Sequence, residues 1–328
     1  MLFLGYRRNG VASIYMLAAI FSMTIDQLNT NLKYLKTHFE GTLKDNQESL
    51  RTILEVLSDL VDSLADAKVK TVDWKYHSQT LVNKIIFTSY SIVRLSEGYL
   101  IKSFKNKDVK IDIIDYQSIY VLTRALIENY VTLCYIYNNE LSDEERLFRF
   151  KLWEVSGLIS RQNFTGEEVN YKKKKEEEKE LIDKIMLQIE AMVDYEKLDK
   201  GELKKLKTIG LPRLESWRNL INESNLKKSI IGNCYSLYSN YAHSEYLSII
   251  QIEQSSMNAI DSNNISCVDL SLTIVRIVNS MTIDYYVKHF KAAELVYNTF
   301  PDNIKNAIII AKRIGEENTA AARRGCIC

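Results

Sequence analysis

Two segments of the chain carry side chains whose types and spacing could do acid–base chemistry or bind an anion. Arg124 and Glu128 stand four residues apart in an otherwise apolar stretch, and Ser239 and His243 stand four apart in "CYSLYSNYAHSEY". Residues four apart share one face of a helix. Because an unpaired charge inside a helical bundle is strongly destabilising, we expect the first pair to meet the polar side chains of the second segment.

This expected meeting has two interpretations. In the structural one, Arg124 and Glu128 form an ion pair that fixes helix register, and His243 is a hydrogen-bonded core residue. In the functional one, the residues form a polar pocket, with Arg124, Glu128 and His243 as catalytic candidates. The residues that would line such a pocket are Tyr120, Arg149, Tyr235, Ser239, Tyr241 and Ser244. A Ser–His nucleophile pair is disfavoured, because a single helix gives the serine no sharp turn and no evident oxyanion hole.

Familiar motifs of enzyme chemistry are missing from the sequence. GxxxxGK[ST], GxGxxG, GxSxG and HExxH do not occur, and no histidine has a glutamate three residues before it. The five cysteines form no CxxC pair, and their scattered positions are typical of reduced thiols in a cytoplasm. We therefore expect no metal and no cofactor.

Composition favours a helical protein. The 328 residues are 46% hydrophobic, and only two prolines and eleven glycines interrupt them. The 43 basic residues balance 42 acidic ones, which leaves a net charge of +1. This balance indicates no general affinity for nucleic acid or acidic membranes.

Hydrophobic periodicity predicts an all-α, multi-helix bundle with long antiparallel helices and no strands. Polar connections are expected at "KSFKNKDVKID" (102–112) and "DKGELKKLKTIGLPR" (199–213). Ser142 and Glu145 have the spacing of a capping box. The predicted helices are 24–66 (one or two), 74–104, 113–139, 143–161, one opening at 172, 213–223, 226–256, 266–296 and 302–314.

The N-terminal region is expected to be an extended amphipathic segment. Its apolar residues over 24–66 form either two ordinary core-facing helices or a coiled-coil-like seam for dimerisation. Residues 1–22 are a packed helix, an extension upstream of a natural start at Met23, or a targeting segment. The predicted division is 1–70 for this region, 71–314 for the bundle domain and 315–328 for a flexible tail.

The same residues carry a family resemblance. Arg124-x-x-x-Glu128, Arg146, Arg149-Phe150 and Tyr235-x-x-x-Ser239-x-Tyr241-x-His243-Ser244 resemble an uncharacterised, all-helical bacterial family of unknown function. The resemblance covers roughly residues 80 to 250. It implies a bacterial, cytoplasmic helical bundle and supplies no activity.

The segment is also distantly similar to HEPN-type helical domains of toxin and phage-defence systems, some of which cleave RNA. Active members carry an arginine a few residues before a histidine on one helix, a spacing absent here. A metal-independent RNase would need His243 as general acid/base and Arg124 to stabilise the phosphorane. We expect instead a binding module of a stress or phage-defence system. Its partner is a protein, a small ligand, or a second copy joined through the N-terminal helices. RNA is the alternative partner, and no membrane is expected.

Overall fold

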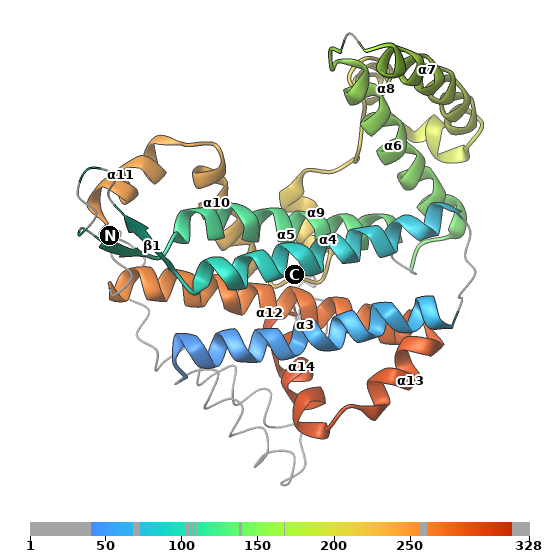
Figure 1. Ribbon diagram of the computed structural model, residues 1–328. Coiled ribbons are helices and arrows are strands. Elements are labelled where there is room, and N and C mark those ends of the chain that lie inside the picture. The colour runs from blue at the N-terminus through green and yellow to red at the C-terminus, as the bar shows by residue number, and fades with distance from the viewer. Residues whose placement is uncertain are drawn as a thin grey trace, which may run out of the picture. The chain divides into compact units, whose positions relative to one another are not determined.

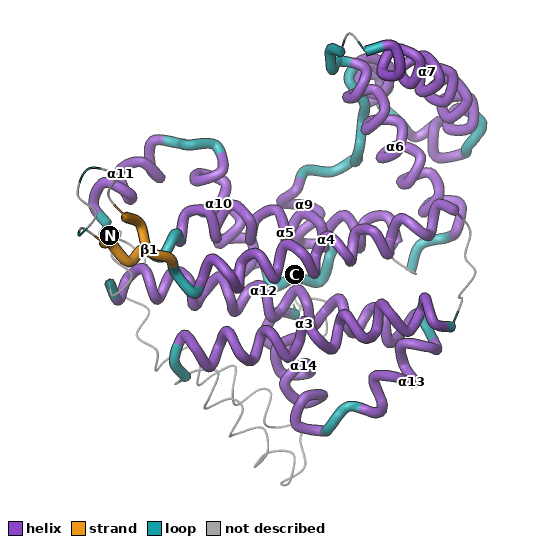
Figure 2. The backbone as a smooth tube through the Cα atoms, in the orientation of Figure 1, coloured by secondary structure: helices purple, strands orange, loops and turns teal. Residues whose placement is uncertain are grey.

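The computed structural model describes residues 41–67, 73–102, 105, 108, 110–137, 140–166, 168–255 and 261–316. Helices account for most of them, which confirms the all-α prediction (Figures 1 and 2). The described residues form two compact units. Unit 1 holds 41–67, 79–130 and 225–316, and unit 2 holds 73–78 and 131–224. Predictions for residues 1–40 and 317–328 lie outside the described residues.

Unit 1 is built around one long helix that contacts several others. In it, α12 packs against α3, α13 and α14, and α3 also packs against α13 and α14. The start of α4 and the end of α5 extend into unit 2. The bounds of these helices are α3 Leu43–Asp66, α4 Asp73–Ser96, α5 Tyr116–Tyr137, α12 Ser262–His289, α13 Lys291–Thr299 and α14 Asp302–Gly315.

Helix α3 shows why these sequences form helices with one buried face. Thr42 caps its start by accepting from the Asp45 backbone N–H, and the Asp45 carboxylate accepts from the Thr42 N–H in return. Leu50, Leu57 and Leu60 follow at helical spacing and are fully buried. Each such leucine contributes about 1.5–3 kcal/mol by leaving water.

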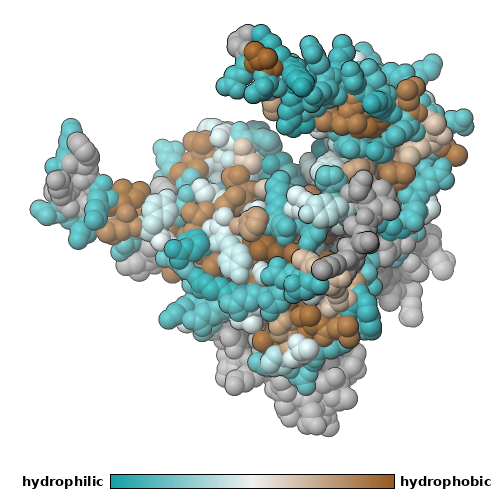
Figure 3. Space-filling model, turned by 45° about the vertical axis from the view of Figure 1, so that its right-hand side comes forward, coloured by the Kyte–Doolittle hydropathy of each residue, from teal (hydrophilic) through white to brown (hydrophobic). Residues whose placement is uncertain are grey.

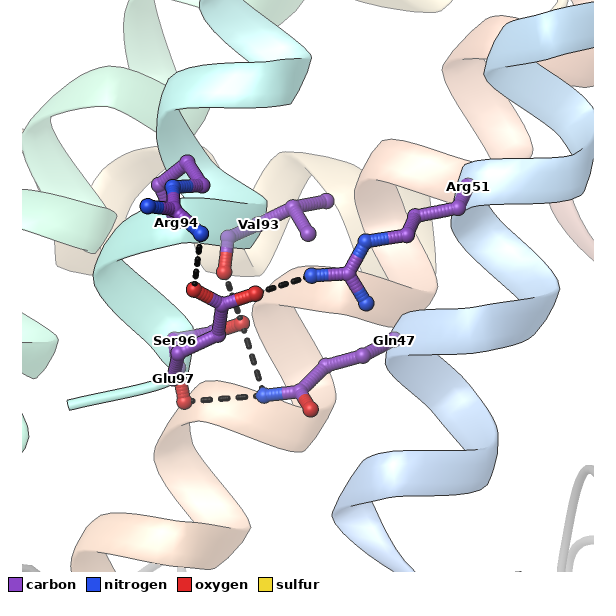
Figure 4. A network of polar contacts seen from close by, with 6 residues as sticks. All are labelled: Gln47, Arg51, Val93, Arg94, Ser96 and Glu97. Atoms are coloured by element: carbon purple, nitrogen blue, oxygen red, sulfur yellow. Dashed lines mark hydrogen bonds and ion pairs between the residues drawn. The ribbon is translucent and has the colours of Figure 1, made fainter.

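A polar network ties α3 to the end of α4 (Figure 4). The Gln47 side chain donates to the Ser96 carbonyl at 2.9 Å and to the Ser96 hydroxyl at 3.0 Å. The Glu97 carboxylate accepts from Arg51 of α3 and, at 2.8 Å, from Arg94 of α4. These contacts fix the position along α3 at which α4 ends.

Among the described helices, α12 alone is long and apolar enough to cross a membrane by length and composition. Two thirds of its most apolar window is buried inside the protein, which also fits a core helix. Length and composition are therefore weak support for a membrane span.

The prediction that the chain has no strands is wrong at one place. Strands β1 (Tyr99–Lys102) and β2 (Lys110–Ile113) pair antiparallel in a two-stranded sheet, where a helix end and a polar loop had been expected. Gly98, with φ +74°, turns the chain out of α4 directly before β1. Strands of four residues are too short for periodicity to reveal.

Two predicted helices are interrupted. The helix expected over 226–256 becomes a π-helical turn, η2 (Lys228–Gly232), followed by α10 (Asn233–Ala242) and α11 (Tyr246–Gln254). Ser244, with φ +52°, makes the break between α10 and α11. The helix expected over 266–296 ends at His289, because Phe290 is extended and α13 begins after it.

Unit 2 has its own apolar core. The first helix, α6, is capped by Ser142, whose hydroxyl accepts from the Glu145 N–H, as its sequence predicted. Buried Phe148, Leu152 and Ile189 are part of the core. The elements beyond those shared with unit 1 are α6 Asp143–Gln162, α7 Val169–Glu190, η1 Val193–Lys197, α8 Lys200–Thr208 and α9 Trp217–Glu223.

The connection predicted over 199–213 contains a helix instead. Asp199 and Glu202 form a full capping box at the start of α8. The connection proper is reduced to the residues after α8, where Gly210 has φ +86° and lies against Ser156 of α6. A capping box within a lysine-rich stretch was the signal that sequence reasoning passed over.

Candidate functional site

Four polar side chains from α5 and α10 meet in unit 1, and we call them the Arg124 cluster: Arg124, Glu128, Tyr235 and Ser239. The Arg124 Nη2 lies 2.9 Å from the Glu128 Oε1. The Tyr235 hydroxyl donates to the same oxygen at 2.8 Å. The Arg124 Nε donates to the Ser239 Oγ at 3.1 Å. The structure thus brings the two segments into contact, while their role in binding or catalysis stays a prediction.

Helical spacing accounts for the geometry of the cluster. Arg124 and Glu128 are one turn apart on α5, and Tyr235 and Ser239 are one turn apart on α10. The Ser239 hydroxyl also donates to the Tyr235 carbonyl at 2.8 Å, which orients its lone pairs toward Arg124. The guanidinium lies 5.4 Å from the centre of the Tyr235 ring, within cation–π range.

The Arg124 cluster is largely but not fully buried. The side chains of Arg124 and Glu128 are 19% and 21% exposed. Burial, and then the hydrogen bond to Glu128, raise the pKa of Tyr235 to about 12. The phenol is therefore protonated at neutral pH and acts as a hydrogen-bond donor to the carboxylate.

Four tyrosine rings pack beside the cluster between α5 and α10. Tyr120 stacks on Tyr238 with ring centres 4.3 Å apart, and the edge of Tyr241 meets Tyr120 at 4.9 Å. Tyr116 extends the group, 6.1 Å from Tyr241. Burial raises the pKa of Tyr120, Tyr238 and Tyr241 above the ordinary range. Tyr120 and Tyr241, predicted to line a pocket, are thus members of a packed aromatic group.

The hydroxyls of this aromatic group reach two further helices, one of them at its end. They link α5 and α10 to α11 and α12, so that a buried phenol has a polar partner in each case. The pairs are Tyr116 with Ser255 at 2.8 Å, Tyr241 with Gln251 at 2.9 Å, Tyr238 with Ser271 at 3.1 Å, and Tyr120 with Cys267.

Sequence reasoning missed Tyr116 and did not place Cys267 near Tyr120. Tyr116 and Tyr120 are one turn apart on α5, so their spacing was a usable signal. Nothing local to Cys267 indicates its neighbour, because the contact depends on how α12 packs.

The predicted place of His243 is wrong. We expected it on the buried helical face that carries Ser239, but α10 ends at Ala242 and His243 is the capping residue after it. Its side chain is exposed, as is that of Ser244. Among the described residues, no hydrogen bond or ion pair joins the His243 imidazole to the Arg124 cluster. The helix ends one residue too early for the predicted stripe to continue.

Arg149 has its own cluster in unit 2. Its Nη1 donates to the Tyr135 carbonyl at 3.0 Å, and its Nη2 donates to the Glu145 carboxylate at 2.9 Å. The guanidinium also lies 4.5 Å from the centre of the Tyr135 ring. Arg149 therefore bonds neighbours within unit 2. These contacts do not join it to the Arg124 cluster, so its predicted place in a ligand pocket stays a prediction.

No group of three or more His, Cys, Asp or Glu side chains that could hold a metal ion occurs within the described ranges. The Arg124 cluster itself shows hydrogen bonding and charge pairing between its own side chains. The fold and the cluster together define an all-helical bundle whose helices are joined by polar and aromatic side chains.

A family model matches residues 78–257, which is more than half of the chain. The chain belongs to this family, which is described as a family of unknown function (DUF5677). The match includes the Arg124 cluster and α11. The predicted membership of an uncharacterised family is thereby confirmed, while the similarity to HEPN domains stays a prediction. Neither a curated protein nor a solved structure matched the chain.

Proposed function

We propose that this chain is a non-catalytic interaction module that binds another protein chain. One observation carries the proposal: Arg124 and Glu128 neutralise each other and are both held by hydroxyls from α10. A guanidinium poised to stabilise a transition state would be aimed at the reacting group rather than engaged in this way. The cluster instead sets the position of α10 on α5.

The residues after α10 would then form the binding surface. The Arg124 cluster fixes the end of α10, and Tyr241 and Tyr116 hold α11 through Gln251 and Ser255. The helix held in this way presents Tyr246 and Leu247 to solvent, with 79% and 50% exposure. Large apolar side chains gathered on a surface are typical of protein-binding sites.

The setting that we propose is the cytoplasm of a bacterium. Cys134, Cys234 and Cys267 are not joined in disulfides, which supports a reducing compartment. The bacterial origin and a role in stress or phage defence rest on the family resemblance of the sequence alone.

The proposal is tested against its enzymatic alternative by an RNA-cleavage assay. Wild type and His243→Ala, with folding checked by circular dichroism, are incubated with structured and single-stranded RNA. We expect no cleavage by either protein. Cleavage by wild type that is lost in His243→Ala would overturn the proposal in favour of the RNase.

A second experiment tests binding directly. Wild type and Leu247→Glu are used as bait in native extracts, and bound proteins are identified by mass spectrometry. We expect a partner, or untagged copies of the chain, on wild type and their loss on Leu247→Glu. Leu295→Glu, on α13 and 59% exposed in wild type, is the matched control. Equal binding by all three proteins would exclude α11 as the binding surface.

A further inference from the structure

Helix α11 and strand β1 both expose large apolar side chains at one end of unit 1, and we call these side chains together the α11–β1 surface. Six large side chains compose it, each 43% exposed or more: Tyr246 79%, Leu247 50%, Ile249 49%, Tyr99 44%, Leu100 44% and Ile101 43%. Hydrophobic residues also gather at other places on the face of the protein shown in Figure 3. A single exposed leucine needs no explanation, but six large residues on two elements do.

The two elements lie at the same end of unit 1. Strand β2 ends at Ile113, and the chain reaches Tyr116 three residues later. The Tyr116 hydroxyl bonds Ser255, the capping residue of α11, at 2.8 Å. Both elements stand at the left in Figure 1.

Strand β1 has an open edge. In the described part of the chain it pairs with β2 alone, and all four of its residues are exposed although they alternate between two faces. Neither face of β1 is therefore packed on the bundle. An unpaired strand edge is a template for another strand.

The charges around the α11–β1 surface indicate which class of partner it can bind. Both signs are present and nearly balanced: Lys102, Lys105 and Lys110 against Asp108, Asp112, Glu245 and Glu253, all exposed. A polyanion or an anionic membrane would call for a net positive surface. A two-fold interface presents the same surface on both sides, so it must be self-complementary in charge. The net charge of +1 for the whole chain opposes association of two copies very little.

The register of the hairpin supports the same occupant. Lys102 lies directly opposite Lys110, and like charges opposite each other destabilise a strand pair. Backbone hydrogen bonds from a second β1 strand would offset this destabilisation. The six apolar side chains would supply part of the ~800 Å² that a standard interface buries on each side.

We propose that the α11–β1 surface is the interface between two copies of this chain, with their β1 strands antiparallel and edge to edge. A two-fold axis at Leu100 places this residue opposite its own equivalent and places Tyr99 opposite Ile101 of the second copy. Aromatic and β-branched residues are favourable cross-strand neighbours. This inference rests on the proposed function and names its partner as a second copy.

Sedimentation equilibrium of the full chain tests the interface. We expect a dimer for wild type over about 1 to 100 µM, and at least tenfold weaker association for Leu100→Glu and for Leu247→Glu. Leu295→Glu, the matched control on α13, should associate like wild type. All three positions are exposed, so circular dichroism should be unchanged.

Cysteine crosslinking tests the register. Under mild oxidation Leu100→Cys should form a disulfide-linked dimer, whereas Tyr99→Cys should do so much less, because its expected neighbour is Ile101. Wild type, oxidised in parallel, accounts for its own thiols. Equal crosslinking of Leu100→Cys and Tyr99→Cys would contradict the register.

Three results would overturn the inference. They are a wild-type monomer over the whole concentration range, equal weakening by Leu295→Glu, and dissociation by Leu32→Glu in the N-terminal segment without any effect of Leu100→Glu. A monomer that cleaves no RNA would defeat the dimer and leave the proposed function standing. RNA cleavage that depends on His243 would defeat the proposed function whatever the mass.

Discussion

Two arginines of this chain have nearly the same chemical surroundings. Arg124 on α5 pairs with a glutamate one turn later, and Arg149 on α6 pairs with a glutamate one turn earlier. Each guanidinium also lies near a tyrosine ring, at 5.4 Å for Tyr235 and 4.5 Å for Tyr135. By residue type alone the two sites are equivalent.

The two sites differ in how far apart their bonded residues lie along the chain. Arg124 and Glu128 are bonded by Ser239 and Tyr235, which lie 115 and 107 residues away. Arg149 bonds Glu145 and Tyr135, which lie 4 and 14 residues away. The first site joins distant segments of unit 1, whereas the second is local to unit 2. A local contact forms with little loss of chain entropy. The first site therefore constrains the packing of segments distant in the chain, whereas the second joins α6 to the end of the helix that precedes it.

High pH should destabilise the region of the Arg124 cluster and its neighbouring tyrosines more than the region of Arg149. Burial raises the pKa of Tyr120, Tyr238 and Tyr241, and the pKa of Tyr235 is about 12. Because each pKa lies above the ordinary value near 10, the phenols stabilise the fold below pH ~10, and the contribution of Tyr235 is lost as the pH rises through about 12. Urea denaturation should show the free energy of unfolding falling steeply there.

The destabilisation by high pH should be smaller in unit 2. Burial also raises the pKa of Tyr135 beside Arg149, but this is one tyrosine rather than four. Hydrogen exchange at pH ~10 to 11 should therefore open α10 before α6. Flat stability over this window, or earlier opening of α6, would contradict the grouping of tyrosines in unit 1.

Removal of the long-range arginine should have the next largest effect. Arg124→Met takes the cation from Glu128 and the donor from Ser239, and should lower the free energy of unfolding by about 2–3 kcal/mol, less than a fully buried pair because water reaches it. Chemical denaturation measures the change. Arg94→Met is the control, because its side chain is 79% exposed and its loss should change stability by under ~0.5 kcal/mol.

Removal of the local arginine should matter less. Arg149→Met should cost about 1 kcal/mol, because Glu145 is 37% exposed and water can replace its partner. The same denaturation experiment gives the value. If Arg149→Met were as destabilising as Arg124→Met, the contrast between long-range and local clusters would be wrong.

The smallest expected effect is that of a single hydrogen bond, from the Tyr235 hydroxyl to the Glu128 carboxylate. A double-mutant cycle of Tyr235→Phe and Glu128→Gln should give a coupling of about 0.5–1.5 kcal/mol, since the two side chains are in direct contact. Tyr241→Phe with Glu128→Gln is the control, because the Tyr241 hydroxyl bonds Gln251 instead. Additive effects in both cycles would exclude a structural role for the Tyr235 bond.

Several features of the fold and site were predictable from the sequence. Leucine spacing in α3, the Ser142 cap of α6 and the apolar run of α5 each depend on residues within a few turns of one another. The meeting of Arg124 and Glu128 with α10 was also predictable, because charges in so apolar a helix require polar partners and few segments offer them.

Tertiary structure decided the remainder. Helix α10 ends at Ala242, so His243 is not part of the Arg124 cluster. Gly98 leads from α4 into a hairpin, and Arg149 bonds residues of unit 2. The sequence by itself determined which stretches are helical and which of their faces avoid water, because hydrophobic spacing and capping are local. Only tertiary packing decided contacts such as that of Tyr238 with α12, because no local pattern in the sequence indicates which distant helix packs against α10.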